Sequence, residues 1–289
     1  MDALGDFRVV APLGQGVSTQ TFRVERDGQT RVTRVTGVGK RLAPRFRADE
    51  KARRAFDTEA LILEELEGRS APRLLARGTD GHGPWLVTEA LPSPTLAGYL
   101  AARGPLAPSP RRLETLVDLA LSALVDVHEA LALDGSGPLS IVHGDLSPEN
   151  LLVSLEAPSP AVWIIDFGLA SFRGAPVPSH GALRGTPRYV APEVARGEPA
   201  TPRSDLFSLG LTLLFAASSE PPRSGAALAR VLLDAGEESV LPYAERATAS
   251  LPPRLARALT SLVAFDAPDR APSARAARSA LEAGRAAPW

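Results

Sequence analysis

The chain has 289 residues, of which 44% are hydrophobic and 22% charged, and its formal net charge is −1. This balance is ordinary for a globular protein and gives no electrostatic case for nucleic acid or an anionic membrane as the main partner. The absence of cysteine excludes disulfides, thiol nucleophiles and thiolate metal sites, and the four scattered histidines do not indicate a metal cluster.

The apolar runs are all shorter than the roughly 20 residues that a membrane span needs. The best candidate, residues 206–218, is predicted to be a helix buried in a protein core. The N-terminal stretch MDALGDFRVV lacks the basic start and long apolar core of a signal peptide. We therefore expect a soluble, cytoplasmic protein with no membrane segment.

The first part of the chain is predicted to form strands. β-branched residues alternate roughly in FRVVAPLG and in TQTFRVERDGQTRVTRV, and Asp27-Gly28 breaks the second stretch with a strong hairpin signal. A helix is expected at about 49–67, where apolar residues recur at helical spacing and Gly68 ends the pattern. Two short strands are expected near 73–78 and 85–88.

From about residue 94 the pattern turns helical. A long amphipathic helix is predicted at 110–133 and is followed by the strand pieces NLLVS and VWIID. A small β-rich lobe and a larger helical lobe, joined at 89–93, are the implied α+β architecture. Further helices are expected near 202–217, 225–235, 252–264 and 273–284.

A glycine-containing turn, LGQGVSTQTFRV at 13–24, places Gly14 and Gly16 between two expected strands. Such glycines let backbone amides approach phosphate oxygens closely. An ordinary hairpin turn accounts for the same residues, since Thr19 stands where a third glycine would complete a phosphate-binding pattern. The turn alone is therefore a weak indication.

Two polar motifs follow buried segments. The stretch IVHGDLSPENLL, residues 141–152, places His143, Asp145 and Asn150 in one loop between apolar runs. The stretch IIDFGLA, residues 164–170, places Asp166 at the end of an apolar strand, where holding Mg²⁺ is one reason for a carboxylate. Taken separately, each motif is also explained by a surface turn.

The order of the motifs is far more specific than any one of them. The glycine turn, a lysine and a helix carrying Glu59 are followed by HGDLSPEN, DFG, GTPRYVAPE, SDLFSLG and DAPDRAP. In this order, over essentially the whole chain, the sequence resembles the eukaryotic-like, bacterial-type Ser/Thr protein kinase family. The resemblance implies one two-lobed, protein-kinase-like domain over 1–289, with an N-lobe at about 1–88, a hinge at about 89–93 and a C-lobe at about 94–289.

The resemblance also implies a reaction, the transfer of a phosphoryl group from ATP, with Mg²⁺, to a Ser or Thr hydroxyl of a protein substrate. Asp145 matches the aspartate that accepts the proton of the acceptor hydroxyl. Asn150 and Asp166 match the metal ligands, and carboxylate and amide oxygens suit such a hard cation.

Two basic residues compete for the role of the lysine that grips the phosphates. Arg34 fits by hairpin length, whereas Lys40 lies 19 residues before Glu59 and is the expected residue type. We favour Lys40, although a solvated loop lysine would look the same in sequence. Glu59 lies on the apolar face of its helix, where a carboxylate needs a partner, and the resemblance pairs it with Lys40.

The resemblance further identifies the nucleotide pocket. Thr88 would guard the adenine site, and the backbone of Glu89 and Leu91 would meet the base. The expected nucleotide-binding residues are Gly14, Gly16, Val38, Lys40, Thr88, Glu89 and Leu91.

Other matches concern the acceptor side and the frame of the large lobe. Thr186, in GTPRYVAPE, matches a threonine that accompanies Ser/Thr selectivity. Glu193 and Arg270 match a buried ion pair that braces the lobe, and Asp205 matches an aspartate that holds the backbone of the catalytic loop.

The sequence departs from the family at two catalytic-loop positions. Gly144 replaces an arginine that pairs with a phosphorylated activation loop, so a phosphate at Ser179 is expected to change activity little. Ser147 replaces a lysine that touches the transferred phosphoryl group, so slow catalysis is expected. The candidate catalytic residues are Lys40, Glu59, Asp145, Ser147 and Thr186.

Two other functions stay open at this point. The incomplete glycine turn and Ser147 are also compatible with a pseudokinase that binds nucleotide or acts as a scaffold. HGDLSPEN resembles the loop of aminoglycoside-type phosphotransferases, which modify small molecules. GTPRYVAPE, SDLFSLG and Arg270 belong instead to protein kinases, and they favour a protein acceptor.

Overall fold

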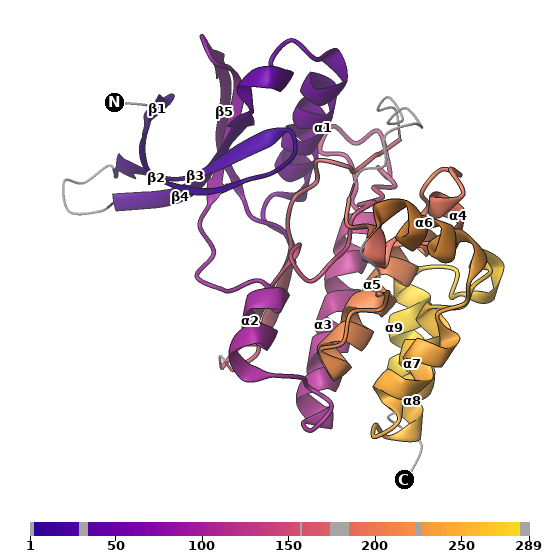
Figure 1. The fold of residues 1–289 in the computed structure, drawn as a ribbon. Coiled ribbons are helices and arrows are strands. Elements are labelled where there is room, and N and C mark those ends of the chain that lie inside the picture. Colours follow the sequence, from indigo (N-terminus) through magenta and orange to yellow (C-terminus); the bar gives the residue numbers. More distant parts are fainter. Residues whose placement is uncertain (1–2, 29–33, 157, 174–184, 224–226, 284–289) are drawn as a thin grey trace.

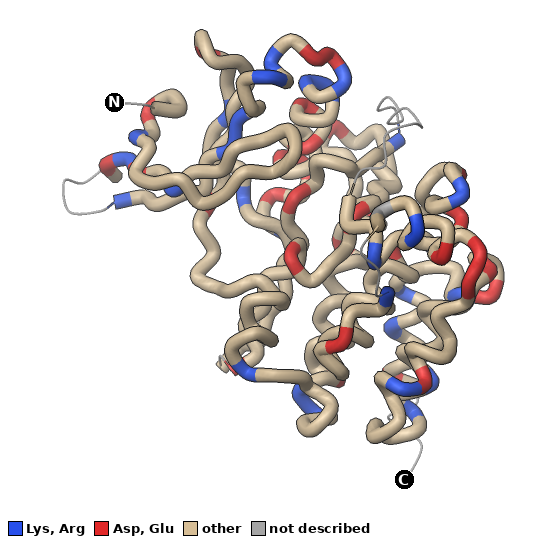
Figure 2. Tube along the Cα trace, in the orientation of Figure 1, with Lys and Arg blue, Asp and Glu red and all other residues tan. Residues whose placement is uncertain are grey.

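The computed structural model describes residues 3–28, 34–156, 158–173, 185–223 and 227–283. Figure 1 shows a β-rich part, coloured indigo to purple, beside a larger helical part that runs from magenta to yellow. This is the two-lobed α+β architecture predicted from the sequence. Lysine and arginine are interspersed with aspartate and glutamate in both parts (Figure 2).

Six strands form one antiparallel sheet in the order β1-β2-β3-β4-β6-β5. Asp27 pairs with Arg34 across the hairpin that joins β3 to β4, so the turn signal at Asp27-Gly28 is confirmed. The strands are β1 (Ala3–Leu4), β2 (Phe7–Gln15), β3 (Thr19–Asp27), β4 (Arg34–Leu42), β5 (Leu74–Asp80) and β6 (Gly83–Glu89).

Helix α1 (Glu50–Leu66) packs beside this sheet and is close to its predicted bounds. Asp49 caps its start, because its Oδ1 accepts the backbone N–H groups of Lys51 and Ala52 in the first turn. It ends where Glu67 adopts a left-handed conformation with φ +50° and Gly68 follows with φ +84°.

The helical part is built around α3 and α5, which pack against each other (Figure 1). The hairpin of β7 (Leu151–Ser154) and β8 (Ala161–Ile164) lies beside α3 and carries the loops of the candidate site. The helices are α2 (Leu96–Arg103), α3 (Pro110–His128), α4 (Pro192–Ala195), α5 (Pro202–Ser218), α6 (Leu228–Glu237), α7 (Leu241–Thr248), α8 (Pro253–Leu262) and α9 (Ala274–Ala283).

The prediction of one helix over 110–133 is wrong at its end, because α3 stops at His128. The next residues pair instead with a returning segment: Ala132 N–H donates to Gly137 O, and Leu139 N–H donates to Ala130 O. These hydrogen bonds between two neighbouring segments replace the bonds that a continued helix would make. Apolar periodicity alone does not reveal such a partner.

Helix α5 is apolar on all sides and buried, as predicted for residues 206–218. Its start is fixed by Thr201 and Ser204, whose side chains each accept a hydrogen bond from the other's backbone N–H. No helix among the described residues is long and apolar enough to cross a membrane.

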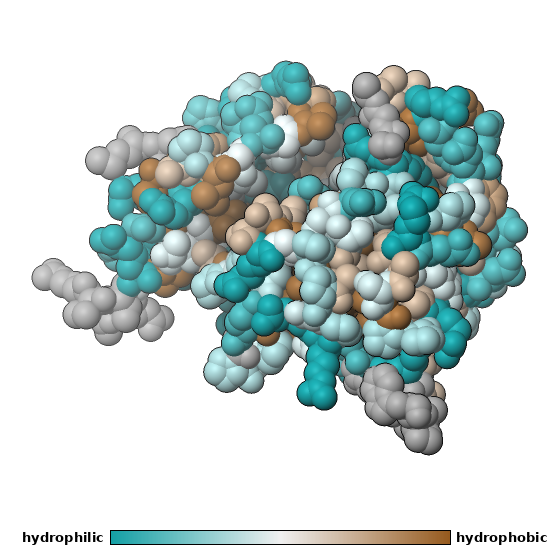
Figure 3. Space-filling model, turned by 60° about the horizontal axis from the view of Figure 1, so that its bottom comes forward, coloured by the Kyte–Doolittle hydropathy of each residue, from teal (hydrophilic) through white to brown (hydrophobic). Residues whose placement is uncertain are grey.

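One continuous hydrophobic core extends from α1 through the helical part, and a smaller cluster of Leu4, Phe7, Val24, Trp85 and Val87 lies on the other face of the sheet. Polar and apolar residues are mixed on the surface turned to the viewer in Figure 3, as is usual for protein surfaces. The short helix α7 was missed in the sequence, because two turns carry too little periodicity to detect.

Candidate functional site

Three charged side chains from distant parts of the chain meet between the sheet and the helical part. Lys40 lies in β4 and Glu59 in α1, and Lys40 Nζ is 2.8 Å from both Glu59 carboxylate oxygens. The same Nζ is 2.7 Å from Oδ1 of Asp166, which follows β8. Lys40 and Glu59 are 7% and 4% exposed, whereas half of the Asp166 side chain is exposed.

The charges of Lys40 and Asp166 support each other. Burial would lower the pKa of the Lys40 ammonium, but the attraction of Glu59 and Asp166 outweighs burial and the pKa is raised. The Lys40 charge in turn holds the pKa of the Asp166 carboxyl below its ordinary value, against the opposing effect of burial. Both groups are therefore charged at neutral pH.

Arg34, the alternative to Lys40, lies at the far end of the same strand. Its side chain is 63% exposed, and its Nη1 is 3.2 Å from Glu25 Oε2 on the neighbouring strand. A strand residue six places from Lys40 is about 20 Å away along the backbone. The structure thus brings Lys40 to Glu59 and Asp166 and leaves Arg34 in an exposed ion pair.

The 143–150 loop is held from below by Asp205, in the first turn of α5. Asp205 Oδ2 accepts the His143 N–H at 2.7 Å, and Oδ1 accepts the Gly144 N–H at 2.9 Å. This backbone contact is the one that the resemblance implies. His128, at the end of α3, adds a further contact from Nε2 to Asp205 Oδ2 at 2.9 Å. A lone histidine on an amphipathic helix offered no sequence signal for that role.

Gly144 occupies a backbone conformation that favours glycine, with φ +77°. A Cβ at this position would lie 3.1 Å from the Leu169 carbonyl oxygen. The glycine that replaces the family's arginine is therefore matched to its local backbone.

Asp145 and Asn150 face each other across the 143–150 loop. Asn150 Nδ2 donates to the Asp145 carbonyl oxygen at 2.8 Å and lies 3.3 Å from Asp145 Oδ2. Asp145 Oδ1 accepts the backbone N–H of Thr186 at 2.8 Å. Burial raises the pKa of the Asp145 carboxyl, and the Thr186 hydrogen bond only partly opposes that rise. This carboxyl is therefore protonated more readily than an exposed aspartate.

Thr186 belongs to the 185–193 segment, which passes close to Asp145. A Cβ on Gly185, where φ is +96°, would lie 2.9 Å from Asp145 Oδ1. The segment is anchored at its other end by Glu193, whose two carboxylate oxygens accept from Arg270 Nη1 at 2.7 Å and Nη2 at 2.9 Å. Burial would raise the pKa of Glu193, but the hydrogen bonds of Arg270 and Ser204 lower it. The predicted ion pair is confirmed.

Asp166 is held in an uncommon backbone conformation, with φ +64°. Phe167, the next residue, is fully buried and its ring meets the His143 ring edge-on, with centroids 5.0 Å apart. Strain of this kind persists where the surroundings fix it, as they do at functional sites. Gly168 completes the turn, and a Cβ there would lie 3.1 Å from Asp166 Oδ1. The glycine keeps that carboxylate oxygen accessible.

Asp166 and Asn150 suit a hard divalent cation. Their loops are held side by side by the Ile165 N–H, which donates to the Asn150 carbonyl oxygen at 3.0 Å. Because Asn150 Nδ2 bonds to Asp145, its Oδ1 is the amide acceptor that can face a metal ion. No cluster of three or more His, Cys, Asp or Glu ligands occurs among the described residues. One carboxylate and one amide match Mg²⁺, which keeps water and phosphate ligands, better than a metal caged by protein.

The expected nucleotide-binding residues lie along neighbouring strands. Gly14 pairs with Thr21, and the Gly16 N–H donates to Thr19 O at 2.8 Å to close a tight, exposed turn. Val38 pairs with Thr88 on β6, two residues from Lys40. Glu89 ends β6, where its N–H donates to Arg73 O, and the half-buried Leu91 follows. Their contacts with a nucleotide stay predictions.

Ser147 is fully buried within the 143–150 loop. Its Oγ makes no hydrogen bond with the part of the chain that the structure describes. A buried hydroxyl without a partner is rare and costly. Its expected contact with a transferred phosphoryl group stays a prediction. Ser179 lies outside the described residues.

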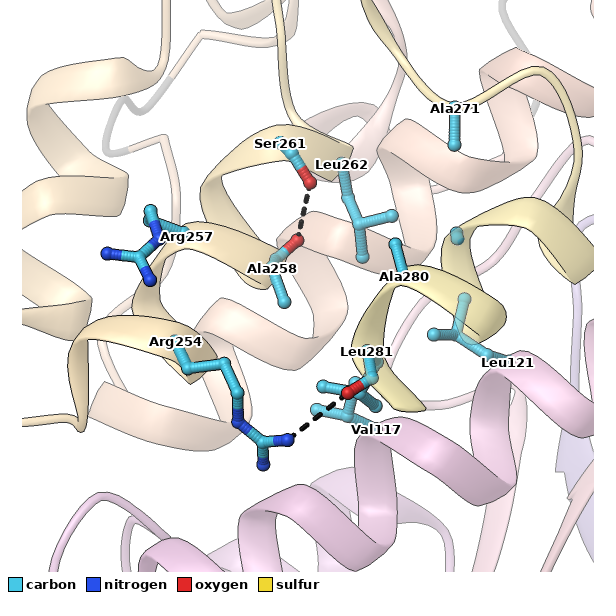
Figure 4. A pocket seen from close by; sticks show the side chains of 11 residues that line it. Val117, Leu121, Arg254, Arg257, Ala258, Ser261, Leu262, Ala271, Ala280 and Leu281 are labelled. Atoms are coloured by element: carbon cyan, nitrogen blue, oxygen red, sulfur yellow. Dashed lines mark hydrogen bonds between the residues drawn. The ribbon is translucent and has the colours of Figure 1, made fainter. Parts of the chain in front are cut away.

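A separate hollow of about 310 Å³ lies between α3, α8 and α9 (Figure 4). Its floor is apolar, with Val117, Leu121 and Leu262, and Arg254 at its edge donates to the Leu281 carbonyl oxygen. None of the predicted site residues lines it. The hollow is therefore distinct from the cluster around Lys40 and Asp166.

Comparison with known proteins shows which proteins this chain is similar to. Residues 7–276 match the family described as "Protein kinase domain". The chain is 29% identical over 264 residues to the serine/threonine-protein kinase PknL of Mycobacterium tuberculosis, which covers 91% of this chain and 62% of PknL. It is 30% identical over 288 residues to the serine/threonine-protein kinase pkn2 of Myxococcus xanthus, which covers 98% of this chain and 33% of pkn2.

The fold is also similar to a solved structure. The crystal structure of the PknI kinase domain of Mycobacterium tuberculosis matches with a TM-score of 0.67 over 98% of both chains, at 20% sequence identity. This likeness concerns the fold. The chain spans less than two thirds of the length of PknL and about a third of pkn2.

Proposed function

The chain belongs to the protein kinase domain family, and on that premise we propose that it transfers the γ-phosphoryl group of ATP to Ser and Thr hydroxyls of protein substrates. The family implies ATP as a substrate and the use of a divalent metal, and Mg²⁺ is the proposed ion. The proposed domain spans 1–289, with its hinge at about 89–93. A cytoplasmic setting, where ATP is available, is part of the proposal.

One observation carries the proposal. Lys40, paired with Glu59, reaches Asp166 across 126 residues of sequence, and Asp166 lies beside the loop that holds Asp145 and Asn150. A cation, two oxygen ligands for a metal and a candidate base thereby lie together. A merely structural cluster would not need a strained aspartate with its carboxylate half exposed.

Each of these residues has a distinct proposed role. Lys40 holds the phosphates of the nucleotide, and Glu59 keeps the ammonium in place. Asp145 accepts the proton of the acceptor hydroxyl, for which a pKa raised by burial is suitable. Asp166 and Asn150 hold the metal ion, which when bound neutralises charge on the phosphates.

The acceptor side supports a protein substrate. The 185–193 segment is fixed at both ends, by the Thr186 N–H on Asp145 and by the Glu193–Arg270 ion pair. Only Thr186, beside the candidate base, has extended backbone before the turn at Pro187–Tyr189, and a peptide hydroxyl is proposed to approach there. Thr186 is the residue proposed to favour Ser and Thr over Tyr. The activity and partners of the relatives apply to this chain as proposals, because it spans only part of their length.

The test is phosphate incorporation from radiolabelled ATP with Mg²⁺ into a general protein acceptor, beside the Asp145→Asn variant. Label in the acceptor that depends on Asp145 supports the proposal. Nucleotide binding without transfer to any acceptor would identify a pseudokinase instead. A parallel panel of aminoglycosides tests the small-molecule function. Label that is transferred only to aminoglycosides would identify a small-molecule phosphotransferase and contradict the proposal.

A further inference from the structure

A buried guanidinium lies beneath the 185–193 segment. Arg223, which follows α5, is 7% exposed. Its Nη1 donates to the carbonyl oxygens of Val190 at 2.9 Å and Arg188 at 3.0 Å, and it lies 3.5 Å from that of Pro187. Arg188 Nη1 donates back to the Arg223 carbonyl oxygen. One side chain thus binds the backbone along a whole turn of the segment.

This cation is paired differently from Arg270. Arg270 meets Glu193 in a two-pronged ion pair, whereas Arg223 makes no ion pair within the described part of the chain and its Nη2 has no hydrogen-bond partner there. Burial lowers the pKa of Arg223 to about 10, and the charge of Asp234 opposes this only in part. Placing a guanidinium without a direct ion-pair partner among the described residues in this buried position costs stability that an apolar side chain would not.

The contacts of Arg223 indicate which part of the structure it stabilises. Phe207 of α5 lies under both arginines, with its ring centroid 4.7 Å from Arg270 Cζ and 5.8 Å from Arg223 Cζ. The buried ring and the two cations connect α5 to the backbone of residues 187–190, through Arg223, and to the Glu193 carboxylate, through Arg270. The carbonyl bonds of Arg223 define the shape of the turn at Pro187–Tyr189, next to Thr186 and its contact with Asp145.

We propose that Arg223 is a positioning residue for the acceptor peptide: it holds the backbone of residues 187–190 in the shape onto which the peptide docks. The inference rests on the proposed function, because it concerns the acceptor of that same site. Arg223 acts through the segment and touches neither nucleotide nor metal ligands. Its loss should therefore weaken use of the peptide and leave use of ATP intact.

The experiment compares Arg223→Met, which keeps the length of the side chain and removes its donors, with Arg203→Met. Arg203 is a matched control, because its Nη1 also donates to a backbone carbonyl, that of Ala267, away from the segment. We expect Arg223→Met to raise KM for the peptide about tenfold or more, the effect of losing two or three carbonyl bonds. KM for ATP, and ATP hydrolysis without acceptor, should stay within about twofold.

Arg223→Lys provides a conservative variant that remains informative if Arg223→Met does not fold. A lysine keeps the charge and reaches one or two of the carbonyls, so it should restore part of the peptide affinity. An unchanged KM for the peptide in both variants overturns the inference. So does an equal rise in Arg203→Met, which would show a general effect of stability.

A second readout separates this inference from the proposed function. Hydrogen exchange of the Tyr189 and Val190 amides should become faster in Arg223→Met and stay unchanged in Arg203→Met. If the wild-type chain transfers no phosphate, the proposed function fails and the exchange data still decide whether Arg223 orders the segment. Unchanged exchange at both amides overturns the positioning role even if transfer is observed.

Discussion

Replacing Lys40 by methionine tests the geometry of the candidate site more sharply than any other single change. Methionine retains most of the length of the side chain and removes its charge. Glu59, which is 4% exposed, then loses the cation that contacts both of its oxygens. Asp166 loses the same partner but remains half exposed to solvent. The main penalty therefore falls on Glu59.

The size of that penalty follows from burial. Breaking a buried ion pair by removing one partner costs about 3–5 kcal/mol, and a protein of this size loses roughly 2–4 °C of Tm per kcal/mol. We expect Tm to fall by roughly 10 °C at pH 7. The rate of phosphoryl transfer should fall at least about 10²-fold, because the phosphates lose the Lys40 cation.

The stability loss should depend on pH. Burial raises the pKa of Glu59, and without Lys40 only the backbone hydrogen bond of Phe167 opposes that rise. A group whose folded pKa is raised destabilises the fold above its unfolded pKa of about 4.3 and ceases to do so below it. The lowered pKa of Asp166 adds wild-type stability that is likewise lost in acid. The difference in Tm between wild type and variant should therefore narrow as the pH falls from 7 towards 4.

The assays are thermal unfolding at several pH values and initial rates of phosphate transfer. Arg34→Met is the matched control, since it removes an exposed ion pair with Glu25 worth about 0–1 kcal/mol. The double variant Lys40→Met/Glu59→Leu should recover most of the stability and none of the activity. A larger activity loss in Arg34→Met, or an unchanged Tm in Lys40→Met, would refute the assignment.

Three further changes test the metal ligands, the base and the departure at Ser147. Asp166→Asn should remove the Mg²⁺ dependence of nucleotide binding, measured by calorimetry with and without chelator, and full turnover by this variant would contradict the metal role. Asp145→Asn should abolish transfer without lowering Tm at pH 7, because burial raises the pKa of Asp145 and its charge therefore destabilises the fold at neutral pH. Any gain in stability of Asp145→Asn over wild type should disappear in acid. A marked fall in the Tm of this variant at pH 7 would instead show that Asp145 has a structural role. Ser147→Lys should raise kcat with little change in KM for ATP, and a folded, ATP-binding variant that is slower than wild type would show that another cation already serves the phosphate.

Much of the fold was predictable because it rests on local patterns. The Asp27-Gly28 hairpin, the capped helix α1 and the all-apolar helix α5 each carry their signal within a few residues. The end of α3 was not predictable in this way. It depends on backbone pairing with residues 137–139, and the apolar periodicity of the helix contains no signal for that pairing.

The candidate site likewise contains residues that the sequence could predict and residues that it could not. Spacing to Glu59 and residue type favoured Lys40 over Arg34, and the structure places Lys40 against Glu59 and Asp166. Arg223 was invisible to the sequence, because its role lies in contacts with the carbonyl oxygens of a distant segment. Backbone acceptors have no residue identity, so a motif cannot point to the side chain that binds them.

The most direct test of the central claim is to map phosphate on a peptide that carries Ser, Thr and Tyr, after incubation with the wild-type chain, ATP and Mg²⁺. The account predicts phosphate on Ser or Thr, none on Tyr, and none with Asp145→Asn or with the metal chelated. Transfer that persists in Asp145→Asn, or a wild-type chain that leaves every hydroxyl unmodified while Lys40, Glu59 and Asp166 remain in place, would contradict it.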